Sequence, residues 1–233
     1  MPARRLHLRF KRFIGSDWSE SVLMAMSRKL VRAVVEKFGA LPSPESSAKT
    51  QRQNTFPTYE KAKEILDKDV GEDKPKLDYG AGLGLSGRLG FDTYEPFPVK
   101  FSPTFTDPSN IPDNSYEGVT NLNVLNVVPP ETRDLIVKDI GRILSPDGTA
   151  IITTRGRDVL NAAGTAGPED MSIITSVGTY QKGFTQKELR EYLKEILGDG
   201  FDVSSVKLGP AGAKIKKLPD ESSSLGALPK DVD

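Results

Sequence analysis

The chain has 233 residues, 36% of them hydrophobic, which is enough for one domain with a substantial core. Its 32 basic and 32 acidic residues balance, so no overall charge attracts it to nucleic acid or a membrane, although a local basic patch still could. Cysteine is absent, which excludes disulfides, thiolate metal sites and a cysteine nucleophile. There is no apolar run of about 18 residues and no signal-peptide core, so we expect a cytoplasmic protein without membrane association, and we predict no metal site.

Residues 1–54 are predicted to form a basic arm, a helix and a linker. Residues 4–13 alternate basic and apolar side chains, which suits either a solvated terminus or a phosphate-binding arm. Asp17 begins a capping-box-like helix start, and apolar residues recur at every fourth position from Trp18 to Phe38. Residues 40–54 are rich in Ser, Pro and Lys, as expected of a flexible linker.

From residue 55 onward, short apolar runs alternate with amphipathic helical patterns, which is typical of an α/β domain with a parallel sheet. The expected helices begin at Thr58, Pro129 and Thr185. The predicted strands cover residues 76–79, 91–95, 101–106, 118–123 and 149–154, followed by a terminal antiparallel hairpin over 201–208 and 213–217.

Three further expectations concern particular segments. The helix from Pro129 is predicted to bury Leu135 on its inner face, together with the isoleucines that follow. Residues 145–148 are predicted to form a turn before the fifth strand, and residues 155–183 to be rich in loops. The tail from residue 219 to 233 is predicted to be disordered.

A glycine turn follows the strand at 76–79 and carries the strongest functional signal. Gly80, Gly82 and Gly84 have no Cβ to keep a ligand from the backbone, and they permit the positive φ angles of a tight turn. Glu95, which ends the next strand, is placed to accept hydrogen bonds from both hydroxyls of a ribose. The pattern predicts a nucleotide cradle, but by itself it leaves a plain turn or a nicotinamide-dependent dehydrogenase open.

Downstream segments narrow that choice. Residues 77–84 (LDYGAGLG), 107–119 (DPSNIPDNSYEGV) and 142–148 (RILSPDG), and then 183–185 with 200–203, occur in the order seen in class I S-adenosylmethionine-dependent methyltransferases. The chain resembles that family over about residues 58–217. The resemblance implies a Rossmann-like, mostly parallel sheet of seven strands with an antiparallel terminal hairpin, and S-adenosylmethionine as the cofactor.

The resemblance also implies a cofactor-binding set. Asp78 would stabilise the glycine loop or the ammonium group of the cofactor's methionine moiety, Glu95 would bind the ribose, and Asp107 would contact the adenine amine. The full set of predicted cofactor residues is Tyr59, Asp78, Gly80, Ala81, Gly82, Gly84, Glu95, Asp107, Asn110, Ile111 and Asn121.

One departure from the family concerns length. Only ten residues separate Gly84 from Glu95, too few for a full helix and a strand, so the first helices of the domain are predicted to be trimmed. We expect the N-terminal helical extension, residues 18–38, to replace the missing cover over the cofactor.

Candidate residues for chemistry lie on loops at the carboxyl ends of the strands. Arg155 and Arg157 are candidates for binding a substrate carboxylate or phosphate, and Tyr180 for orienting the acceptor. Tyr180, Lys182 and Asn123 are the predicted catalytic residues, although each also has an ordinary structural interpretation. His7, the only histidine, lies in the basic arm, which makes a histidine base improbable.

The acceptor stays open at this point. The favoured function is methyl transfer to an oxygen or nitrogen nucleophile of an unidentified small molecule or nucleic acid. The missing cysteine excludes the covalent route of cytosine C5 methylation, and residues 121–124 lack the Asn-Pro-Pro-aromatic pattern of amino-directed DNA methyltransferases. The alternatives are a nucleic-acid-directed methyltransferase and a cofactor-binding scaffold or regulatory module without turnover.

Overall fold

The computed structural model describes residues 56–219. The predicted basic arm, the helix over 18–38, the linker and almost all of the predicted tail lie outside these residues. Within them, no helix is long and apolar enough to cross a membrane.

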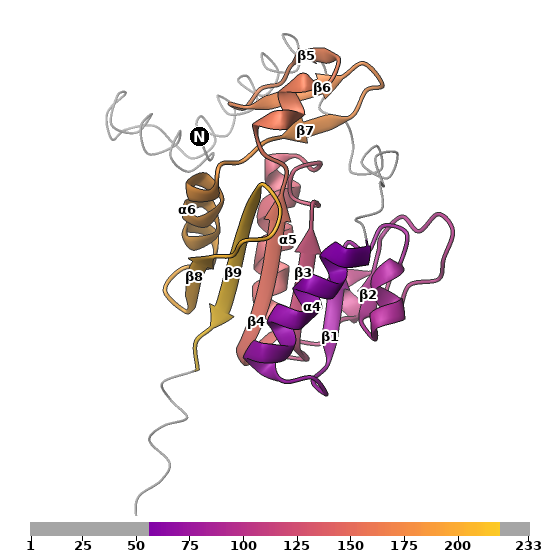
Figure 1. The fold of residues 1–233 in the computed structure, drawn as a ribbon, viewed down its shortest axis with the longest axis vertical. Helices are drawn as coiled ribbons and strands as arrows, with labels where there is room; N and C mark the ends of the chain where they lie inside the picture. The colour runs from indigo at the N-terminus through magenta and orange to yellow at the C-terminus, as the bar shows by residue number, and fades with distance from the viewer. Residues whose placement is uncertain (1–55, 220–233) are drawn as a thin grey trace, which may run out of the picture.

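A six-stranded sheet forms the centre of the domain, in the order β2-β1-β3-β4-β9-β8 (Figure 1). Its first four strands are parallel, and β9 and β8 form the antiparallel edge. The strands are β1 (Lys76–Tyr79), β2 (Asp92–Tyr94), β3 (Tyr116–Leu122), β4 (Leu144–Thr154), β8 (Phe201–Ser205) and β9 (Ala211–Lys217). The Rossmann-like α/β architecture and the terminal hairpin predicted from the sequence are therefore confirmed.

The sheet has one strand fewer than predicted. Residues 101–106 form no strand, and only a single parallel bridge between Tyr94 and Phe105 lies where a seventh strand was expected. Proline and serine interrupt this segment, so it does not sustain a ladder of hydrogen bonds. The neighbouring helix is reduced to the 3₁₀ turn η2 (Leu85–Leu89), which confirms the trimmed first helix.

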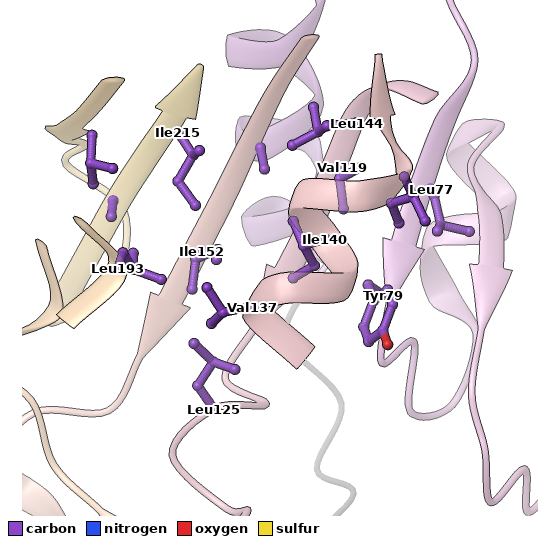
Figure 2. Packing of buried hydrophobic residues seen from close by; sticks show 14 of the residues in the cluster. Leu77, Tyr79, Val119, Leu125, Val137, Ile140, Leu144, Ile152, Leu193 and Ile215 are labelled. Atoms are coloured by element: carbon purple, nitrogen blue, oxygen red, sulfur yellow. The ribbon is translucent and has the colours of Figure 1, made fainter. Parts of the chain in front are cut away.

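Helices cover both faces of the sheet (Figure 1). On one face lies α4 (Phe56–Val70), whose Tyr59, Ala62 and Leu66 pack with Leu122 and Ile151. On the other lie α5 (Pro130–Ile143) and α6 (Gln186–Leu197). Figure 2 shows Val137 and Ile140 of α5 against Val119 and Ile152 of the sheet.

Two of the helix predictions are corrected in detail. Thr58 lies inside α4, which begins two residues earlier, so it is not the cap. Leu135 of α5, which the pattern assigned to the inner face, is exposed, and Val137 is buried instead. The start of α6 is as predicted, because Thr185 and Glu188 form a complete capping box.

The turn predicted at residues 145–148 is part of β4. The pairing of β3 with β4 shifts between Tyr116 and Gly118, and Asp147 has a φ of 63°. The turn-forming residues of this segment therefore produce an irregularity within β4, and they do not mark the point where the strand begins.

Residues 155–183 are more ordered than predicted. They form η4 (Arg157–Asn161) and a separate antiparallel sheet, β5 (Gly164–Ala166), β6 (Ser172–Thr175) and β7 (Tyr180–Lys182). This small sheet lies beyond one end of the main sheet, at the top of Figure 1. We refer to residues 155–183 as the insertion.

Candidate functional site

A cavity of about 810 Å³ lies between the glycine turn, the segment that follows β3, and the insertion that follows β4. The start of α4 contributes Tyr59, and β2 ends at the cavity with Tyr94, followed directly by Glu95. Parallel strands release their chains at one edge of a sheet, which explains why segments distant in sequence converge here.

The glycine turn is fastened to the end of β2. The N–H groups of Gly80 and Ala81 both donate to the Tyr94 carbonyl at 2.9 Å, and the Gly82 N–H donates to Glu95 Oε2 at 2.8 Å. Gly82 has a φ of 58°, and a Cβ added there would meet nothing within 4 Å. Because Gly82 also lines the cavity, its missing side chain leaves space beside exposed backbone.

Glu95 is a buried carboxylate at the edge of this space. Its Oε1 accepts from the Phe97 N–H at 3.1 Å, while Oε2 accepts from Gly82. Burial raises the pKa of Glu95 above its ordinary value, and the two backbone N–H groups oppose that rise. The sequence-predicted juxtaposition of turn and acid is therefore present.

Asp78 lies beneath the turn, fully buried in β1. Its carboxyl oxygens accept from Ser86 Oγ of η2 at 2.6 Å and from Thr120 Oγ1 of β3 at 2.8 Å. Burial raises the pKa of Asp78 to about 6, against the hydrogen bonds from Ser86, Thr120 and Tyr59. These contacts support the loop, the first of the two roles implied for Asp78.

Gly84, which was predicted to bind the cofactor, does not line the cavity. It has a φ of 75° and is the N-cap of η2. An added Cβ would lie 2.4 Å from the Phe101 ring. The missing side chain at this position makes room for an aromatic ring of the protein itself.

The predicted adenine-contact residues lie outside the cavity lining. Asp107 caps η3 (Pro108–Asn110) by accepting from the Ser109 N–H at 2.9 Å, and the bonds from Ser109 lower the pKa of Asp107. Ile111 is fully buried, and its carbonyl accepts from Arg142 Nη1 at 2.7 Å. The structure gives these residues local structural contacts.

Three asparagines lie at the end of β3 or just after it. Asn121 is buried outside the lining and donates to the Tyr79 carbonyl at 2.8 Å, which ties β3 to β1. Asn123 lines the cavity with a φ of 59°, and its N–H donates to the Thr153 carbonyl. Asn126, which the sequence analysis did not select, is 2% exposed and also lines the cavity.

Tyr180 and Lys182 do not line the cavity. The Tyr180 hydroxyl donates to Glu169, and burial raises the pKa of Tyr180. Lys182 Nζ is buried, forms an ion pair with Glu188 at 2.7 Å, and donates to the Gly183 carbonyl. Lys182 fastens the insertion to α6, whereas Tyr180 bonds Glu169 within the insertion, and these positions do not support the catalytic roles predicted for them.

Arg133 connects the insertion to the segment after β3. Its buried guanidinium donates to the Leu125 and Val128 carbonyls and makes two bonds to Glu169, at 3.1 and 3.0 Å. Leu125 and Val128 belong to the segment after β3, whereas Glu169 belongs to the insertion. A single side chain therefore joins two walls of the cavity.

Of the two predicted substrate-binding arginines, only Arg155 lines the cavity. Its Nε donates to Asp158 Oδ2 at 2.8 Å, and Nη2 bonds the same oxygen. Arg157 is exposed and is not part of the lining.

Other lining residues were missed by sequence reasoning. Tyr79 and Tyr94 end neighbouring strands, and their ring centres lie 4.5 Å apart with the planes tilted by 56°, so their strand-end positions were an available signal. Thr175, Thr179 and Gln181 come from a segment predicted as loop, from which the sequence analysis selected Tyr180 and Lys182 instead.

The sequence matches no protein-family model and no curated protein. Among solved structures, the PH0226 protein from Pyrococcus horikoshii OT3 is similar to this chain with a TM-score of 0.52 at 14% identity, over 73% of this chain and 93% of that one. That likeness shows a shared fold.

Two other solved structures are also similar. One is the 1,6-didemethyltoxoflavin-N1-methyltransferase from Burkholderia thailandensis, with bound S-adenosylhomocysteine (TM-score 0.47, 16% identity, 88% of this chain and 93% of that one). The other is an S-adenosylmethionine-dependent methyltransferase from Mesorhizobium loti (TM-score 0.45, 12% identity, 69% and 98%).

Proposed function

We propose that the protein is an S-adenosylmethionine-dependent methyltransferase that acts on an oxygen or nitrogen nucleophile. The observation that carries this proposal is the pairing of Gly82 with Glu95. Gly82 has a positive φ and open space where a side chain would be, and its N–H donates to Oε2 of the buried Glu95 at 2.8 Å. Both residues line a cavity at the carboxyl edge of a parallel sheet. The strand order agrees with the fold of that class.

The residues present fit the cofactor. Gly82 leaves room for it against the backbone. The carboxylate oxygens of Glu95 can accept hydrogen bonds from ribose hydroxyls in place of those they now accept from the N–H groups of Gly82 and Phe97. Tyr59, Tyr94 and Phe97 line the same end of the cavity and offer apolar surface. When bound, S-adenosylmethionine supplies a methyl group activated by a positively charged sulfur.

The chain itself would act mainly by holding the acceptor and excluding water. Among the cavity-lining residues of the described part, the only charged side chains are Glu95, Arg155 and Asp158. Positioning a nucleophile in line with the bond that breaks requires few dedicated groups. In favourable cases it lowers the activation free energy by about 7–11 kcal/mol. Asn123 and Asn126, at the end of β3, are the proposed positioning amides.

The test is calorimetric titration of the full chain with S-adenosylhomocysteine, comparing Gly82→Ala with Gly90→Ala. Both glycines have positive φ, 58° and 85°, and an added Cβ meets nothing within 4 Å at either position. Both variants should therefore suffer similar backbone strain, on the order of 1 kcal/mol. Only Gly82 lines the cavity, so Gly82→Ala should weaken binding by roughly tenfold or more, as expected for one misplaced methyl group in a fitted site.

Equal affinities of the two variants, or no binding of S-adenosylhomocysteine by the unmodified chain, would contradict the proposal. Binding without methyl transfer to any member of a broad acceptor panel would favour the scaffold alternative.

A further inference from the structure

Part of the cavity lining lies outside the glycine turn, and we call this part the acceptor chamber. Its walls are the segment after β3 (Asn126, Val127 and Val128), the first residues of the insertion (Arg155, Asp158, Asn161 and Ala162) and the later part of the insertion (Thr175, Val177, Thr179 and Gln181). The inference below rests on the proposed function, because it takes this chamber to hold the methyl acceptor.

The two charged side chains of the chamber neutralise each other. Arg155 bonds Asp158 Oδ2 through Nε and Nη2, and Asp158 Oδ1 accepts from the Gly156 N–H at 3.0 Å. Glu95 lies at the other end of the cavity and is bound by Gly82 and Phe97. The chamber therefore offers no uncompensated positive charge to a carboxylate or phosphate, and burying such an anion without a partner is costly.

The remaining polar groups are uncharged. Thr175 and Thr179 share a hydrogen bond of 2.7 Å, while Gln181 and Asn161 add amide groups to the lining. Asn126 is 2% exposed, and its Oδ1 has no hydrogen-bond partner among residues 56–219. A buried amide of this kind needs a ligand or water to satisfy it, with the amide orientation set by that partner.

The rest of the chamber lining is apolar; Val128 and Val159 are buried, whereas Val177 is 75% exposed. Valines and alanines from all three walls contribute to it, namely Val127, Val128, Val159, Ala162, Ala163 and Val177. The whole cavity, about 810 Å³, is within the range of sites for small molecules, and the cofactor would occupy part of it.

We propose that the acceptor chamber takes an uncharged small molecule that carries hydrogen-bonding groups, and that it discriminates against carboxylates, phosphates and nucleic acid. The amides of Asn126 and Gln181, on segments joined by the 2.8 Å hydrogen bond from the Lys182 N–H to the Asn126 carbonyl, would bind the polar groups of this molecule, and the valines would contact its apolar part.

The test uses matched neutral and anionic probes: benzamide with benzoate, and uracil with orotate. Dissociation constants are measured by ligand-observed NMR on the full chain in the presence of S-adenosylhomocysteine. We expect the neutral member of each pair to bind at least roughly tenfold more tightly, because the anion finds no free counter-charge. We also measure whether S-adenosylhomocysteine alone displaces the neutral probe. Displacement would place the probe in the cofactor part of the cavity, and its absence would place the probe in the acceptor chamber.

A charge variant sharpens the test. Asp158→Asn keeps an oxygen for the Gly156 N–H but releases Arg155 from its ion pair, so benzoate affinity should rise by roughly tenfold. Asp202→Asn, which makes the same charge change on exposed β8, should leave the affinities unchanged.

Three results would overturn the inference: failure of all neutral probes to bind, equal or tighter binding of benzoate by the unmodified chain, or an unchanged probe ratio in Asp158→Asn. Competition between benzamide and a labelled single-stranded RNA or DNA would also overturn it, in favour of a nucleic acid acceptor. The proposed function is judged separately, by S-adenosylhomocysteine binding. If that binding is absent while neutral probes still bind, the proposed function fails and the chamber's preference for neutral ligands stands.

Discussion

Asp78 combines two properties that normally oppose each other, since it is fully buried and also bonded by hydroxyl groups that favour its ionised form. Burial is the larger influence and raises its pKa from 3.8 to about 6. The folded state consequently binds this proton more readily than the unfolded chain. The contribution of Asp78 to stability is therefore present below about pH 4 and is lost as the pH rises through about 6.

The variant Asp78→Asn isolates this effect, because the amide does not ionise. Relative to the unmodified protein, its free energy of unfolding should increase between pH 4 and pH 7.5 by an amount on the order of 3 kcal/mol. Urea denaturation at a series of pH values measures the difference. Asp73→Asn, at an exposed position, is the control, and parallel pH profiles for Asp78→Asn and the unmodified protein would refute the interpretation.

At the scale of elements, the insertion is held to the domain by a buried ion pair. Arg133 of α5 bonds Glu169, which also accepts from Tyr180 of β7, and the guanidinium lies 5.1 Å from the centre of the Phe184 ring. Burial opposes ionisation of Glu169, but the bonds from Arg133 hold its pKa below the ordinary value. This electrostatic contact between α5 and the insertion therefore joins the walls of the acceptor chamber, together with the ion pair between Lys182 and Glu188 of α6.

Arg133→Met should destabilise the protein by about 1–3 kcal/mol, because it leaves the Leu125 and Val128 carbonyls without their donor and the half-buried Glu169 without its counter-charge. The double variant with Glu169→Gln should lose less than the sum of the single variants, as expected for directly coupled residues. Urea denaturation of all four proteins completes the cycle. Glu64→Gln, which breaks the exposed pair with Lys68, should leave the free energy of unfolding nearly unchanged, and additive losses in the main cycle would argue against the coupling.

At the scale of the whole molecule, one sheet separates two apolar clusters. Ile151 belongs to the cluster under α4, and its neighbour Ile152 belongs to the cluster under α5 and α6. The alternation of side chains along β4 sends consecutive residues to opposite faces. Because both clusters share the same strands, we expect residues 56–219 to unfold as one cooperative unit.

Ile151→Ala and Ile152→Ala should each lower the free energy of unfolding by about 2–5 kcal/mol, since both side chains are fully buried. Each variant should still unfold in a single transition that coincides in circular dichroism and fluorescence. Leu135→Ala, at an exposed position on α5, should change stability by no more than about 0.5 kcal/mol. Separate transitions for the two clusters would contradict the single cooperative unit.

The features that the sequence predicted well depend on neighbours in the chain. The glycine turn needs positive φ within a few residues, and the capping box at Thr185 closes over one helical turn, so both are visible in local patterns. The six sheet strands follow from apolar runs. The seventh strand and the cap at Thr58 were predicted from weaker local signals, which tertiary packing overrode.

The sequence by itself determined the α/β architecture, the terminal hairpin and the proximity of the glycine turn to Glu95. Only the tertiary structure decided that Tyr180 bonds Glu169, that Lys182 fastens the insertion to α6, that Gly84 accommodates Phe101, and that the Arg155 charge is compensated. The physical reason is that a residue's burial and its choice of partner depend on segments brought together by folding. Composition and spacing record the backbone requirements of a turn, but they do not record which side chain will lie opposite it.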